Sequence, residues 1–196
     1  VVLGVDSMAA FESQGAFLGA TVGRYANRIA QAQYEYDGQT VQLVASQGAN
    51  CLHGGKLGWS HRRWTLVSKS ERTAVFSLCA ADGEQGFPGN VTASVTYELT
   101  DANEVCIRYL ANSDKATPIN LTNHAYFNLM GAESGANVLE HKLSINAERY
   151  LPTDETAIPL GELRSVRNTG FDFRCMKTVG QDLMSDEQQA FAKGYD

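Results

Sequence analysis

The feature that most limits the fold is a repetition of short, alternating apolar and polar segments separated by turn residues. The clearest example is QYEYDGQTVQLV, residues 33–44, in which Asp37-Gly38 stands between two alternating runs. Asp-Gly is a favoured two-residue hairpin turn because both of its positions accept a positive φ. The pattern therefore predicts an antiparallel hairpin here.

Longer segments show the same pattern. Residues 62–80 predict a second hairpin and residues 90–112 a third. Helical periodicity is scarce, and its best candidate is SDEQQAFA, where Ser185 and Gln188 match a capping box. Since antiparallel strands dominate, an all-β sandwich or barrel is expected.

Length and charge narrow the class of protein. The 196 residues suit one domain or part of one. The net charge is −6 and the 16 Lys and Arg residues are scattered, so neither nucleic acid nor an anionic membrane is an expected partner. No apolar run reaches the roughly 18 residues that a membrane-spanning helix needs. The sequence therefore predicts a soluble protein.

The four cysteines, at positions 51, 79, 106 and 175, form no C-x-x-C pair, which argues against a zinc knuckle and a redox motif. Two disulfides are conceivable, but four separate buried thiols in a reducing cytosol are favoured. The expected location is therefore cytoplasmic. Both ends of the chain look cut, because it begins without Met inside the apolar run VVLGV and stops at KGYD.

The segment TPINLTNHAYFNL, residues 117–129, alternates like a strand but has an unusual polar face. That face carries no charge, although a solvent-facing side would normally carry Lys, Glu or Asp. His124 and Tyr126 project to the same side, so they predict a patch that hydrogen-bonds a polyhydroxylated ligand around a group suited to proton transfer. The alternative is a satisfied, half-buried histidine beside a tyrosine.

Glycine-rich loops carry other reactive side chains, and loops on a rigid β scaffold often hold sites. Arg28 follows Asn27 in GRYANRIA, where it is either a surface charge or a fork of donors for sugar hydroxyls. His53 precedes Gly54-Gly55 in NCLHGGKLG, where it is either a turn residue or an accessible imidazole.

Metals and nucleotide cofactors are not indicated. A metal site would need His53, His61 and His124 to converge with a carboxylate, yet no usual spacing such as H-E-x-x-H is present. Neither a P-loop motif nor a strand-linked G-x-G-x-x-G occurs, so no nucleotide cofactor is expected. Asp82 and Glu84 are explained most simply as turn carboxylates.

Six ordered motifs resemble those of the galactose mutarotase (aldose 1-epimerase) family, most closely its bacterial members: GRYANRIA, NCLHGG, DGEQGFPGN, TPINLTNHAYFNL, YLPTDETAIPLGE and KGYD. The resemblance extends along essentially the whole chain. It implies a large antiparallel β-sandwich, here incomplete, as a single partial domain over residues 1–196. It also implies an isomerase that interconverts the α and β anomers of aldohexoses such as galactose and glucose, without metal or organic cofactor.

The resemblance implies roles for individual residues. His124, in the N-H-x-Y-F-N motif, matches the family's general acid. His53, in L-H-G-G, matches a histidine that contacts the sugar and assists proton chemistry at the ring oxygen. The remaining matches are expected to bind the sugar: Asn27, Arg28, Tyr126 and Asp196.

The family's general base is a glutamate, which the resemblance places beyond Asp196, so residues 1–196 alone are expected to be close to inactive. Three alternatives stay open: a phosphosugar (hexose 6-phosphate) epimerase on the same scaffold, a non-catalytic carbohydrate-binding β-sandwich, and a structural β domain. A monomer or a homodimer is expected.

Overall fold

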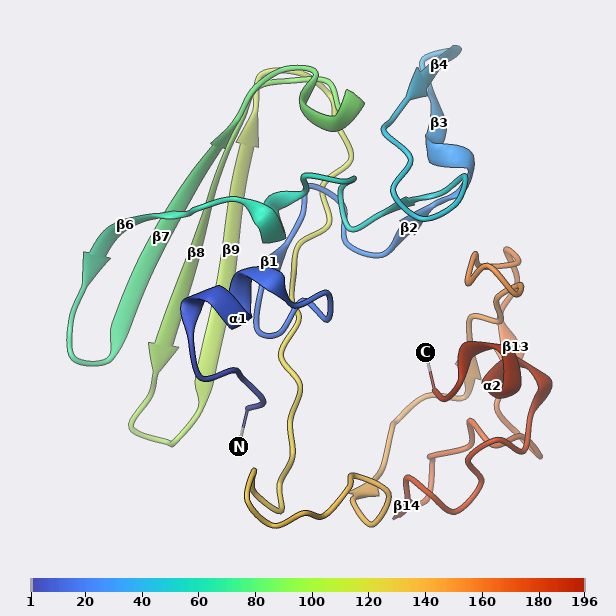
Figure 1. Cartoon of the computed structure of the whole chain (residues 1–196). Coiled ribbons are helices and arrows are strands. Elements are labelled where there is room, and N and C mark those ends of the chain that lie inside the picture. The colour runs from blue at the N-terminus through green and yellow to red at the C-terminus, as the bar shows by residue number, and fades with distance from the viewer. Residues whose placement is uncertain (1, 196) are drawn as a thin grey trace. The chain divides into compact units, whose positions relative to one another are not determined.

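The computed structural model describes residues 2–195, and strands dominate it (Figure 1). The chain divides into two compact units. The N-terminal unit is Gly4–Ala125, and the C-terminal unit is residues 126–195 together with residues 2–3. The expected all-β class is confirmed, whereas the single partial domain over residues 1–196 stays a prediction.

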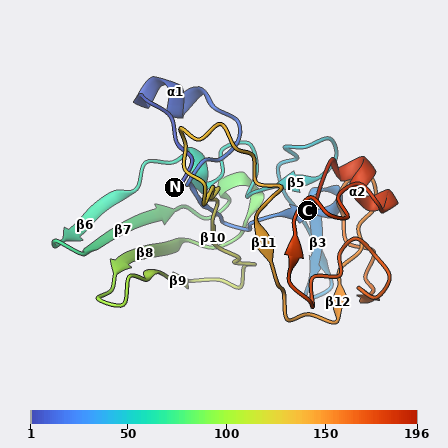
Figure 2. The ribbon, with the colours of Figure 1, turned by 90° about the horizontal axis from the view of Figure 1, so that it is seen from below.

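A four-stranded antiparallel sheet, in the order β6-β7-β8-β9, is the largest element of the N-terminal unit, and its strands lie side by side in both ribbon views (Figures 1 and 2). Shorter ladders join β1 to β10, β2 to β5 and β3 to β4. The elements of this unit are α1 (Met8–Ser13), β1 (Thr21–Val22), β2 (Arg28–Ile29), η1 (Ala30–Ala32), β3 (Gln33–Tyr36), β4 (Gln39–Gln42), β5 (Cys51–Leu52), η2 (Trp59–His61), β6 (Thr65–Lys69), β7 (Thr73–Ala80), η3 (Glu84–Gly86), β8 (Val91–Leu99), β9 (Val105–Ser113) and β10 (Thr122–Asn123).

All three expected hairpins are present. At the tip of β3–β4, Asp37 and Gly38 have φ of 49° and 71°, the positive values that a type I′ turn requires. The other two hairpins are β6–β7 and β8–β9, in the segments whose alternation predicts them.

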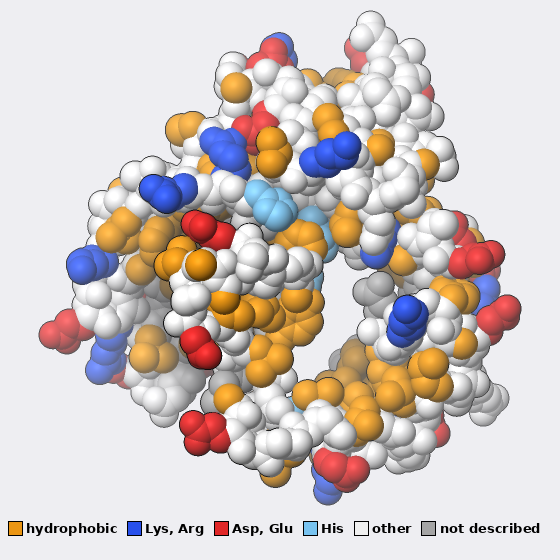
Figure 3. Space-filling view, viewed as in Figure 1, with side chains coloured by type: hydrophobic (Ala, Val, Ile, Leu, Met, Phe, Trp, Pro, Cys, Tyr) orange, Lys and Arg blue, Asp and Glu red, His pale blue; other side chains and the backbone are white. Residues whose placement is uncertain are grey.

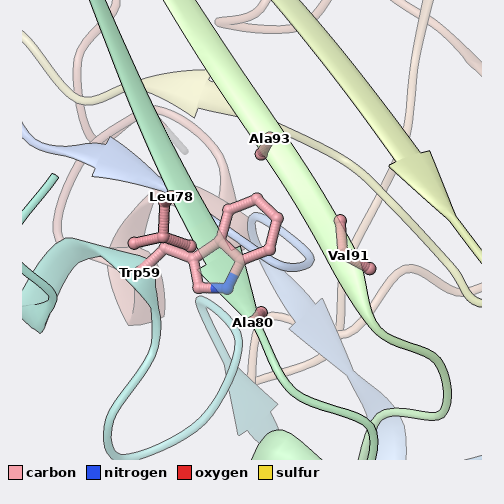
Figure 4. Close-up of a cluster of buried hydrophobic side chains, with 5 residues drawn as sticks. All are labelled: Trp59, Leu78, Ala80, Val91 and Ala93. Atoms are coloured by element: carbon pink, nitrogen blue, oxygen red, sulfur yellow. The ribbon is translucent and has the colours of Figure 1, made fainter. Parts of the chain in front are cut away.

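The N-terminal unit has two described clusters of buried hydrophobic side chains, of which one lies on the four-stranded sheet and the other contains Ala32, Leu43, Cys51 and Phe87. Val91 and Ala93 on β8 pack with Leu78 on β7 and with Trp59 from η2 (Figure 4). Trp59 is 1% exposed, and its indole Nε1–H donates a hydrogen bond to the Glu84 carboxylate at 3.1 Å. A buried indole needs such a partner for its N–H. This core therefore anchors the loop that follows His53.

The C-terminal unit contains β11 (Lys142–Leu143), β12 (Arg149–Tyr150), β13 (Arg164–Ser165), β14 (Lys177–Thr178) and α2 (Glu187–Ala192), with β11 paired to β14 and β12 to β13. The expected capping box is wrong, because the residue that caps α2 is Asp186. The Ser185 backbone N–H instead binds the side chain of Gln189, and Gln188 accepts a hydrogen bond from the Thr153 backbone. Gln189 and Thr153 therefore take the groups of Ser185 and Gln188 that a capping box would use.

The expected continuous strand over residues 117–129 is also wrong, since only β10 is a strand there. β10 pairs antiparallel with β1, whereas Asn120 makes a parallel bridge to Tyr25, and this change of partner interrupts the ladder. Two residues of the apolar side of this alternation, Phe127 and Leu129, are 62% and 77% exposed. The C-terminal unit begins after Ala125, so the segment is shared between the units.

The cysteines are four free thiols, of which Cys51 is buried. The expected burial of all four is wrong, because Cys79 and Cys175 are exposed. Neither described helix, each six residues long, is long and apolar enough to cross a membrane.

Candidate functional site

The N-terminal unit brings two predicted site histidines together from distant parts of the chain. The ring centroids of His53 and His124 are 5.4 Å apart, with their planes at 90°. His53 follows β5 and His124 follows β10, so two separate ladders position the pair. Both side chains are half-buried. Pale-blue histidine side chains reach the viewed surface beside hydrophobic ones (Figure 3).

His53 is held by reciprocal hydrogen bonds with Asn27. Its backbone N–H donates to the Asn27 carbonyl at 3.0 Å, and the Asn27 backbone N–H donates to Nδ1 of the imidazole at 3.0 Å. Because Nδ1 accepts, the neutral ring carries its proton on Nε2. His53 therefore presents Nε2–H as a hydrogen-bond donor.

Arg28 joins the same group through β2, on which it stands opposite Leu52 of β5. Its guanidinium donates from Nε to the Gln47 side-chain oxygen at 2.7 Å and from Nη1 to the Asn27 side-chain oxygen at 3.1 Å. These two bonds fix the plane of the guanidinium fork. Asn27, Arg28 and His53 thus form one hydrogen-bonded set. Their substrate-binding roles stay predictions.

Gly54 lets the two site loops pack backbone against backbone. Its φ is +83°, and a Cβ built there would lie 2.6 Å from the Arg24 nitrogen and closer still to the Gly23 carbonyl oxygen. Any larger residue would force the loops apart. Both the lack of room for a Cβ and the positive φ therefore require glycine at position 54.

His124 is fastened to the segment that precedes β1. Its backbone N–H donates to the Ala20 carbonyl at 2.9 Å, and its carbonyl accepts from the Gly19 N–H at 3.0 Å. These bonds lie directly beyond the Thr21–Asn123 pair that ends the β1–β10 ladder. The same segment carries Phe17, whose ring centroid is 4.8 Å from that of His53 and 5.5 Å from that of His124.

Sequence reasoning missed Phe17 and Arg24. Arg24 is 2% exposed and donates hydrogen bonds from Nη1 to the Pro88 carbonyl at 2.7 Å and to the Thr117 hydroxyl at 3.3 Å. Burial lowers the pKa of Arg24, and the nearby carboxylate of Glu84 partly offsets this. Arg24 ties three loops together around the site. No local pattern distinguishes it from an ordinary surface arginine, or Phe17 from an ordinary loop aromatic.

Two predicted site residues are not brought to this cluster by the described geometry. Tyr126 belongs to the C-terminal unit and is 39% exposed, and its expected alignment with His124 stays a prediction. Asp196 lies outside the described residues. Within residues 2–195, no group of three or more His, Cys, Asp or Glu side chains is arranged to hold a metal ion.

The cluster gathers imidazole, amide and guanidinium groups, which are side chains able to hydrogen-bond hydroxyl groups and, in the case of imidazole, to transfer protons. Comparison with known proteins gives the family. The family model described as aldose 1-epimerase matches residues 1–196, and the chain belongs to that family.

Individual relatives carry names that agree with this family assignment. The chain is 50% identical over 195 residues to the aldose 1-epimerase of Escherichia coli (strain K12). This alignment covers 100% of the chain and 56% of the Escherichia coli protein. It is 40% identical over 196 residues to the galactose mutarotase of Bos taurus, covering 100% of this chain and 55% of that protein. The chain therefore spans little more than half the length of these relatives.

Solved structures show the same fold. A crystal structure of the GalM/aldose epimerase homologue from C. elegans matches with a TM-score of 0.88 at 38% identity, over 95% of this chain and 56% of that one. The galactose 1-epimerase from Lactobacillus acidophilus NCFM matches with a TM-score of 0.90 at 34% identity, over 100% and 58%. The expected galactose mutarotase-like fold class is confirmed.

Proposed function

We propose that the protein is an aldose 1-epimerase, an isomerase that interconverts the α and β anomers of aldohexoses such as galactose and glucose. The observation that carries the proposal is the meeting of His53 and His124, 5.4 Å apart, beside the hydrogen-bonded pair Asn27 and Arg28. The names of relatives up to half identical to the chain support it.

The proposed reaction is a proton relay across the sugar ring. A base takes the proton from the anomeric hydroxyl while an acid protonates the ring oxygen, so the bond from C1 to the ring oxygen breaks and the aldehyde forms. C1 then turns about its bond to C2, and the reverse proton transfers close the ring from the other face. Each positioned acid or base contributes typically about 10²–10⁴-fold.

We assign His124 as the general acid and His53 as its assistant at the ring oxygen. His53 suits this role because its Nε2–H is a donor in the neutral ring. The general base is proposed to be a glutamate beyond residue 196.

The sugar hydroxyls are proposed to bind Asn27, Arg28, Tyr126 and Asp196. Among these, the Asn27 amide and the Tyr126 hydroxyl are neutral and orient sugar hydroxyls without the cost of burying unpaired charges. We further propose a cytoplasmic location, with which the four free thiols agree, and a monomer or homodimer.

Polarimetry tests the function. The full-length protein should accelerate the loss of optical rotation of fresh α-D-galactose and α-D-glucose. Hexose 6-phosphates should react no faster than free hexoses, whereas a strong preference for them would favour the phosphosugar epimerase. Sugar binding without any acceleration would instead favour a carbohydrate-binding protein.

A further inference from the structure

The aromatic ring of Phe17 lies close to the rings of three histidines. Its ring meets His53 edge-on at a centroid distance of 4.8 Å and 73°, and it is tilted by 37° against His124 at 5.5 Å. The ring centroid of His61 lies 6.0 Å from that of Phe17, with the ring planes at 68°. A single side chain therefore packs against both members of the proposed proton-transfer pair.

The backbone holds Phe17 in this place at a conformational cost. Its φ is 57°, in the left-handed region that is uncommon for aromatic residues. The Phe17 carbonyl accepts from the Ala20 N–H at 3.0 Å, and the Gln14 side chain accepts from the Ala16 N–H at 2.7 Å. Since Ala20 also binds the backbone of His124, the turn and the histidine are one connected structure.

The hydrophobic core does not account for this placement. Phe17 is half-buried, and it is absent from both described clusters of buried side chains and from the residues packed against them. Its described ring contacts are with histidines. Strain of this kind, accepted outside the core, is typical of residues that shape a site.

We propose that Phe17 is a positioning residue that fixes the ring orientations of His53 and His124 for proton transfer at the sugar ring oxygen. An imidazole turns readily about its second side-chain torsion, since that torsion has broad minima. Hydrogen bonding at Nδ1 limits this rotation for His53, and the ring of Phe17 limits it for both histidines. The proposal rests on the proposed function, because it assigns a use to the same two histidines.

The test compares three variants of the full-length protein by polarimetry with α-D-galactose. Phe17→Leu removes the ring, Phe17→Tyr keeps it, and Phe11→Leu is the matched control. Phe11 lines the same cavity of about 390 Å³ as Phe17, but its ring makes none of the described histidine contacts. Misplacement of reacting groups by about 1 Å costs on the order of 10²-fold. We expect Phe17→Leu to lower kcat about ten-fold or more with little change in KM, and Phe17→Tyr to retain most of kcat.

The outcomes separate this inference from the proposed function. An inactive wild-type protein overturns both. An active wild type with an unchanged kcat in Phe17→Leu overturns the inference alone, as does an equal loss in Phe11→Leu or a change confined to KM. If Phe17→Leu fails to fold, as judged by its melting curve, Phe17→Met fills the space without a ring and is held to the same criteria.

Discussion

The glycine after His53 gives the sharpest test of how the site loops are packed. Gly54→Ala places a methyl group where the structure leaves no room, 2.6 Å from the Arg24 nitrogen and against the Gly23 carbonyl oxygen. Its backbone must also keep a φ of +83°. Two penalties therefore act at one position.

Typical free-energy costs give the size of each of the two penalties. A left-handed conformation costs a residue with a Cβ roughly 1–2 kcal/mol. Overpacking of a tight contact typically adds about 1–3 kcal/mol. Gly54→Ala is therefore expected to lower the free energy of unfolding by about 2–5 kcal/mol.

Gly48→Ala is the matched control, because its φ is +58° but no atom lies within 4 Å of the added methyl group. It should suffer the backbone penalty alone, about 1–2 kcal/mol. Urea unfolding of both variants measures the difference. Equal losses of stability would refute the close packing of the GRYANRIA and LHGG loops.

Further predictions concern titratable groups. Hydrogen bonds from Arg174 lower the pKa of Asp172 to about 2 from 3.8, so this carboxylate stabilises the folded state above about pH 4, and the contribution is lost as the pH falls towards 2. The urea midpoints of wild type and Asp172→Asn should thus differ at pH 6, and this difference should shrink as the pH falls towards 2. A constant difference would refute the link. Burial raises the pKa of the Cys51 thiol, so a thiol reagent at pH 8 should modify exposed Cys175 rapidly and Cys51 only on unfolding; equal rates in the folded protein would contradict this burial.

The hairpins could be predicted from the sequence because their information is local. Asp37-Gly38 supplies the turn, and the alternation on each side matches strands that pair with their chain neighbours. The same applies to the β6–β7 and β8–β9 hairpins, whose strands pair with their chain neighbours across short turns. His53 and His124 could be singled out because glycines and uncharged polar residues surround them in the sequence.

The features of the fold and of the site that could not be predicted depend on contacts between residues far apart in the sequence. The segment 117–129 alternates like a strand, but its partners change from β1 to Tyr25 within a few residues, which periodicity does not reveal. Arg24 is buried only because carbonyls from distant loops surround its guanidinium. Phe17 likewise reaches His124 across more than a hundred residues of chain. Neither residue carries a local signal of its role.

We propose that His124 donates the proton that opens the sugar ring. His124→Asn removes the proton donor, and His141→Asn is its control, since His141 lies in the C-terminal unit and its Nε2 accepts a hydrogen bond from the Leu129 backbone. The deciding measurement is kcat for the mutarotation of fresh α-D-galactose by the full-length protein. We predict a loss of about 10²-fold or more in His124→Asn and near wild-type kcat in His141→Asn. Retention of most activity in His124→Asn would contradict the role of His124 as the proton donor.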